Sequence, residues 1–266
     1  MARQPSGWWW AVLAMVMLSA CASTRSPDKG HFVERTITLE GHTSRYQVFV
    51  PVTAAAQRGA LPVVLFLHGS GERGSDGRRQ TEAGLGPHLR RHARDFPALV
   101  VLPQVPEDQE WSGLNNRIAL AALDAAMAEF GADPARQYLT GMSMGGYGSW
   151  NIALDHPTRF AAIVPVCGAV LAPRAVRASL LVESVADEAD PYTAIAGRLK
   201  TTPIWMFHGA LDDVVLPEDD RRLKAAFEAA GATDVRYTEY PQGNHNAWDA
   251  TYADAAMWEW LFAQRR

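Results

Sequence analysis

Short apolar runs recur through this chain, and they limit the folds that it can adopt. Each is three to six residues long and is bounded by glycine, proline or polar residues. The runs cover residues 63–67, 98–102, 138–140, 161–166 and 204–207. Such runs are typical of strands that are buried on both faces, as in a parallel sheet with helices on either side.

Helical stretches separate these runs. A spacing of four residues, which defines one face of a helix, is shared by Ile118, Ala122, Ala126 and Phe130. Another helix is predicted to begin at Pro217, and a last one to cover 253–264. Ahead of them, residues 35–39 and 46–50 alternate like two antiparallel strands joined near Gly41. The order of these strands and helices along the chain predicts a three-layer α/β sandwich with a mostly parallel sheet, folded as one domain.

Charge and cysteine content exclude several classes of protein. The chain has 25 Lys+Arg against 29 Asp+Glu and no long basic run, so we expect no nucleic-acid partner. Its 2 cysteines cannot form a disulfide-rich scaffold. Cys167 ends an apolar run, which favours a buried structural thiol over a nucleophile, because no histidine or acid flanks it.

The N-terminus predicts export. Residues 8–20 form an apolar run that is too short to span a bilayer about 30 Å thick, so residues 1–20 are expected to be a cleaved signal. The sequence Leu-Ser-Ala-Cys that ends at Cys21 resembles the bacterial lipoprotein box, and the alternative is an ordinary secretory signal. We therefore expect a cell-envelope lipoprotein, at the outer membrane or periplasmic face of a Gram-negative host. Membrane contact would be limited to lipidated Cys21, followed by a tether over 21–31 and a catalytic domain over 32–266.

A nucleophile motif follows one of the predicted strands. Residues 141–145 read Gly-Met-Ser-Met-Gly, and a helix is predicted to begin at Gly145. The small residues are needed because a strand that turns sharply into a helix leaves no room for Cβ atoms, and the turn exposes the central serine. Ser143 is thus a candidate nucleophile, and the backbone N–H of Met144 is a candidate donor to an oxyanion.

A serine nucleophile needs a base and an acid that orients the base. His245 lies in a loop before the last predicted helix and follows both the serine and a strand-end acid. Asp212 and Asp213 begin the loop after the apolar run 204–207; we prefer Asp212, with Asp213 in reserve. The glycine-rich loop 68–74 would supply the second oxyanion donor from Ser70, since it lacks the spacing of a phosphate-binding loop.

Other residues bear on binding. His88 and His92 are four apart, but no third ligand lies near them in sequence, so we expect a solvated helix face and no metal. Trp111, in a loop after Pro103, is predicted to be an exposed wall of the substrate pocket. Trp248, three residues after His245, is expected to line the pocket or to pack the loop beneath it.

Together these motifs resemble a known family. The resemblance covers about residues 63–265 and rests on the segments 68–74, 103–104, 141–148, 207–209 and 240–249. It is to bacterial α/β-hydrolase serine carboxylesterases, in a group labelled predicted peptidase or phospholipase/carboxylesterase and related to dienelactone hydrolases and feruloyl esterases. It implies an α/β-hydrolase fold and ester hydrolysis without a cofactor. The site residues implied are Ser143 as nucleophile, His245 as base, Asp212 as acid, and Ser70 and Met144 at the oxyanion hole.

The segment 168–202 is longer than the resemblance predicts and contains an apolar stretch over 180–185. We expect it to form a small cap over the pocket. The function predicted is hydrolysis of a small-molecule carboxylic ester through an acyl-enzyme. The alternatives are a serine peptidase, an acyltransferase and, from a different class, a non-catalytic envelope binding protein.

Overall fold

The computed structural model describes residues 28–173 and 177–266 of the 266-residue chain. The predicted export signal, Cys21 and most of the predicted tether therefore lie outside the described residues. Within these two ranges, no helix is both long enough and apolar enough to cross a membrane.

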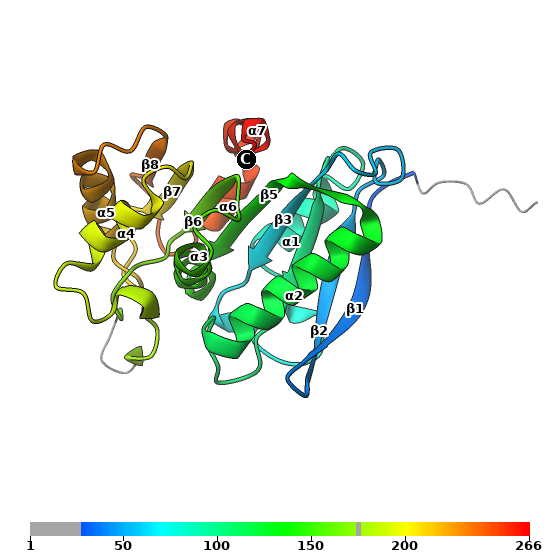
Figure 1. The fold of residues 1–266 in the computed structure, drawn as a ribbon, viewed down its shortest axis with the longest axis horizontal. Helices are drawn as coiled ribbons and strands as arrows, with labels where there is room; N and C mark the ends of the chain where they lie inside the picture. Colours follow the sequence, from blue (N-terminus) through cyan, green and yellow to red (C-terminus); the bar gives the residue numbers. More distant parts are fainter. Residues whose placement is uncertain (1–27, 174–176) are drawn as a thin grey trace, which may run out of the picture.

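An eight-stranded sheet forms the centre of the domain (Figure 1), in the order β1-β2-β4-β3-β5-β6-β7-β8. The strands are β1 (His31–Leu39), β2 (His42–Val50), β3 (Leu61–Leu67), β4 (Leu99–Pro103), β5 (Ala132–Met142), β6 (Ala162–Val166), β7 (Ile204–Gly209) and β8 (Val235–Tyr240). The first two form an antiparallel hairpin, β2 runs antiparallel to β4, and all other pairs are parallel. This confirms the predicted mixed sheet and α/β-hydrolase fold.

Helices cover both faces of the sheet. One face carries α2 (Gly113–Phe130), α3 (Met144–Asp155), α4 (Pro191–Leu199) and α5 (Glu218–Ala229). The other carries α1 (Leu85–Arg91), α6 (Trp248–Ala253) and α7 (Ala255–Ala263). Strand β3 shows why two cores form: Val63 and Leu65 point to the first face, whereas Val64 and Phe66 point to the second. Short 3₁₀ turns cover Ser70–Glu72, Arg79–Thr81 and Glu183–Val185.

The C-terminal helix differs from the prediction. A single helix was expected over 253–264, but the structure has two, α6 and α7, and the first begins at Trp248. Asp254 separates them because its backbone is extended, and its carboxylate accepts a hydrogen bond from Ala256 N–H. An aspartate in this position caps a new helix instead of continuing the old one.

The segment 168–202 is anchored in the main core. Leu180, Val182 and Val185 are buried in the same cluster as the inner faces of α3 and α4. Asn151 of α3 holds this part of the segment, since its side chain donates to Leu181 O and accepts from Glu183 N–H. The apolar stretch thus packs against the body of the domain. Residues 174–176, inside the predicted cap, lie outside the described residues.

Candidate active site

Ser143 occupies a strained turn between β5 and α3. Its φ of 52° and ψ of −118° lie in a region that a residue with a side chain rarely adopts. Glycine on each side makes the turn possible: a Cβ atom on Gly141 would lie 2.2 Å from Gly145 O, and one on Gly145 would lie 2.0 Å from Leu67 O. The two glycines therefore let the chain reverse closely enough to expose Ser143 Oγ at the start of α3.

Ser143, His245 and Asp212 lie in one hydrogen-bonded line. Nδ1 of His245 is 2.7 Å from Asp212 Oδ2, and its Nε2 is 2.9 Å from Ser143 Oγ. A carboxylate only accepts, so Nδ1 carries the ring proton and Nε2 is left to accept the serine hydroxyl proton. The three residues follow β5, β7 and β8, whose carboxyl ends meet at one edge of the parallel part of the sheet.

Asp212 is a buried carboxylate that is fully hydrogen-bonded. Its Oδ1 accepts from the N–H groups of Val214 and Val215, each at 2.9 Å, while Oδ2 faces His245 and His208. Burial alone would raise its pKa, but the hydrogen bonds from His208, His245 and Val215 hold the pKa well below its usual range. Asp213, the reserve candidate, is exposed. The geometry thus favours Asp212.

The two predicted oxyanion donors lie where β5 and β3 end. Met144 is the first residue of α3, so its N–H belongs to the first turn, whose donors have no intrahelical acceptor. Ser70 begins a 3₁₀ turn just after β3. His68 braces this loop, because its Nδ1 lies 2.6 Å from Gly69 O and its Nε2 accepts from Val105 N–H. Burial lowers the pKa of His68 to about 4, so the ring is neutral.

An arginine from the 168–202 segment reaches this loop. Arg177 Nη1 donates to Ser70 Oγ at 2.8 Å, and Nη2 binds both oxygens of Glu110 at 2.8 and 3.0 Å. The contact links the segment to the predicted oxyanion loop. Sequence reasoning missed Arg177, because nothing in its neighbourhood indicates which distant loop it meets.

The two tryptophans proposed as pocket walls have different surroundings. Trp111 is only 2% exposed, and its Nε1 donates to His68 O. It fits against α3 where Gly148 has no side chain, since a Cβ there would lie 2.4 Å from Trp111 Cβ. The expectation of an exposed wall was therefore wrong for Trp111. Trp248 is half-buried and meets His245 edge to face, with ring centroids 5.5 Å apart.

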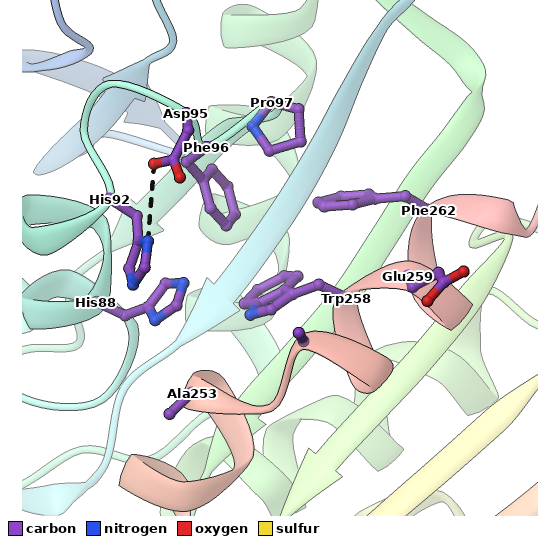
Figure 2. A pocket seen from close by; sticks show the side chains of 10 residues that line it. His88, His92, Asp95, Phe96, Pro97, Ala253, Trp258, Glu259 and Phe262 are labelled. Atoms are coloured by element: carbon purple, nitrogen blue, oxygen red, sulfur yellow. Dashed lines mark ion pairs between the residues drawn. The ribbon is translucent and has the colours of Figure 1, made fainter.

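An aromatic pocket of about 330 Å³ lies between α1 and α7, on the face of the sheet that is opposite to α3 (Figure 2). None of Ser143, Asp212 or His245 lines it. His88 is buried there between the rings of His92 and Trp258. Burial lowers the pKa of His88 to about 4, and the neighbouring His92 ring adds a smaller lowering effect. The predicted solvated face was thus wrong for His88, which completes an aromatic stack, whereas His92 is exposed. Among the described residues, no group of three side chains is placed to bind a metal.

Two further buried residues lie behind the site, and one of them, His208, contacts Asp212. His208 lies at the end of β7, four residues before Asp212, and Asp220 lies on α5. Asp220 could have been noticed in the sequence. It shares a buried helix face with Leu223 and Phe227, so an acid occupies a position where an apolar residue is expected.

Comparisons with known proteins show which family and which folds this chain resembles. The prolyl oligopeptidase family matches residues 119–264. A thermostable esterase has a TM-score of 0.70 and 32% identity over 88% of this chain, which spans 63% of that protein. The sequence matches none of the curated proteins.

Two more distant structures share the fold. A ferulic acid esterase has a TM-score of 0.69 and 17% identity, covering 90% of this chain and 99% of that one. An S-formylglutathione hydrolase from Agrobacterium tumefaciens has a TM-score of 0.62 and 20% identity, covering 90% and 96%. With the family match extending over more than half of its length, the chain belongs to the prolyl oligopeptidase family.

Proposed function

We propose that this protein is a serine hydrolase that cleaves small-molecule carboxylic esters through an acyl-enzyme. The observation that carries the proposal is the line of hydrogen bonds from Ser143 Oγ through His245 to Asp212, at 2.9 and 2.7 Å. A serine hydroxyl becomes nucleophilic when a base that is already oriented takes its proton, and this geometry supplies both the base and its orientation.

The reaction follows from the positions of the protons. As Ser143 Oγ bonds to the ester carbonyl carbon, its proton passes to His245 Nε2, and the Asp212 carboxylate stabilises the imidazolium. The N–H groups of Met144 and Ser70 would bind the oxyanion. His245 then gives its proton to the departing alcohol, which leaves an acyl group on Ser143. Water repeats the two steps and releases the acid.

Exposed apolar side chains lie in the loop that contains the triad acid. Leu211 and Val214, on either side of Asp212, are 60% and 44% exposed, and Leu216 is 59% exposed. Such side chains suit an ester with an apolar acyl or alcohol part. They favour an apolar substrate over a charged one.

A panel of substrates tests this proposal. We expect p-nitrophenyl acetate and butyrate to be cleaved with kcat/KM about 10²-fold or more above that of the matching p-nitroanilides, because an amine leaving group asks more of the general acid. A fluorophosphonate probe should label the peptide that contains Ser143, as mass spectrometry would show. Faster cleavage of the anilides than of the esters would indicate a peptidase. Formation of glycerol esters when glycerol is present would indicate an acyltransferase. Absence of both labelling and turnover would leave a binding protein.

We also propose that the chain is an exported lipoprotein held at the cell envelope through Cys21. The apolar run over 8–20 and the Leu-Ser-Ala-Cys sequence that ends at Cys21 support this proposal. A single acyl group binds membranes only weakly, so anchoring would need more than one chain on the lipidated cysteine. Changing Cys21→Ser is expected to move the protein from the membrane fraction to the soluble fraction, as immunoblotting of both fractions would show. Retention of the variant in the membrane fraction would contradict the proposal.

A further inference from the structure

A second buried histidine lies directly behind the triad acid. His208 is fully buried at the end of β7. Its Nε2 lies 2.8 Å from Val215 O and 3.2 Å from Asp212 Oδ2, and its Nδ1 lies 2.8 Å from Asp220 Oδ2. Both His208 and His245 therefore contact the same oxygen of Asp212.

The partners of His208 fix its protons. A backbone carbonyl only accepts hydrogen bonds, so Nε2 must carry a proton, and Nδ1 faces a carboxylate oxygen. His68 offers an internal contrast, since one of its ring nitrogens accepts from a backbone N–H and the ring is neutral. With acceptors on both sides, His208 is suited to be an imidazolium that donates from both nitrogens.

Asp220 is the counter-ion of this cation. Its side chain is 1% exposed, and among the described residues its Oδ1 has no hydrogen-bond partner, so His208 is the group that compensates its burial. Burial opposes the charged ring, but the hydrogen bonds to Asp212 and Asp220 outweigh it and raise the pKa of His208 to about 10. A charged His208 agrees with the low pKa of Asp212.

We propose that His208, held as an imidazolium by Asp220, is a positioning residue that fixes the Asp212 carboxylate in the orientation in which it accepts the Nδ1 proton of His245. The inference rests on the proposed function of the triad. A cation on the far side of Asp212 donates a charge-assisted hydrogen bond to Oδ2 and holds this oxygen in place. Oδ2 is thereby presented to Nδ1 of His245, which leaves Nε2 of that ring to accept the Ser143 proton.

The other titratable groups around His208 do not replace this pair. Burial raises the pKa of Tyr147 on α3, of Cys167 after β6 and of Tyr237 on β8, so all three stay neutral near pH 7. On β8, the hydrogen bond from Arg221 lowers the pKa of Glu239 to about 2, and the two form an ion pair. On α5, Asp219 instead accepts from the Tyr192 hydroxyl and from the N–H groups that follow β6.

The variant Asp220→Asn tests the inference through the steady-state kinetics of ester hydrolysis. An asparagine of the same shape can donate to Nδ1 of a neutral His208, so the cation is lost while the packing is kept. Asp212 then receives a weaker hydrogen bond from His208, so kcat should fall about tenfold while KM stays unchanged. Glu218→Gln is the matched control, since it removes one exposed charge from the same helix and should leave both kcat and KM unchanged. A kcat of Asp220→Asn equal to that of the wild type would overturn the inference.

A second measurement needs neither activity nor a variant. In wild-type protein with ¹⁵N-labelled histidine, one buried ring should keep both nitrogens protonated up to about pH 9, well above the ordinary histidine pKa of about 6.5. That signal should be absent at pH 8 from Asp220→Asn if the variant folds. If all eight histidines of the wild type are neutral at pH 8, the inference is wrong, whatever the substrate of the enzyme proves to be.

Discussion

Replacing Ser143 with alanine is expected to lower kcat for p-nitrophenyl butyrate by about 10⁶-fold, the scale of loss when a triad that acts as a unit is broken. The hydroxyl that would form the acyl-enzyme is removed, while Met144 N–H and the loop at Ser70 remain. Substrate binding and a small residual rate should therefore persist. Initial rates with excess enzyme would measure the loss, and thermal unfolding would show that the variant is folded.

The same variant should no longer be labelled by a fluorophosphonate. Ser184→Ala is its matched control, because Ser184 lies on a surface 3₁₀ turn and its hydroxyl donates to Asp155. Labelling and turnover of the control should equal those of the wild type. Turnover of Ser143→Ala within tenfold of the wild type would contradict the acyl-enzyme mechanism.

Asp212→Asn is expected to lower kcat by about 10⁴-fold with little change in the fold, because it reverses the direction of a hydrogen bond. The two N–H groups of Val214 and Val215 would hold the new amide oxygen where Oδ1 now lies. The amide NH₂ would then face His245 Nδ1 and force that nitrogen to accept. Its proton would move to Nε2, which could no longer take the proton of Ser143.

Steady-state kinetics of Asp212→Asn and Asp213→Asn would separate the two neighbouring acids. Asp213 is exposed, and its amide variant should keep kcat within about twofold, as expected of a surface substitution. A large loss in Asp213→Asn together with a small one in Asp212→Asn would assign the acid to the reserve candidate.

The fold could be predicted from sequence because its signals are local. The apolar runs became strands, and the hairpin turn near Gly41 was predicted from alternation alone; Glu40 and Gly41 both have positive φ there. The last helix was misjudged because the break at Asp254 depends on one cap. Local patterns decide element type, but they do not reveal where a single backbone angle interrupts an element.

The site was predictable where a motif sets the geometry, and less so elsewhere. Ser143 lies in a turn that its glycines determine, so its position could be inferred. The exposure of Trp111 was predicted wrongly because a residue in a loop is expected to be exposed. The space that receives its side chain, beside Gly148 on α3, is known only from the structure. His208 and Asp220 were missed because their pairing joins a strand to a helix and appears only once both are packed.

The strand order has a consequence for how the enzyme would meet its substrate. The chain enters the sheet at β1, on one edge, whereas Asp212 and His245 follow β7 and β8 at the opposite edge. At about 4.8 Å per strand, these edges are about 30 Å apart. A lipid attached at Cys21 would thus join the described domain at the β1 edge of the sheet, whereas the acid and base of the triad follow strands at the opposite edge. Esters dissolved in the surrounding fluid could approach Ser143 without first entering the bilayer.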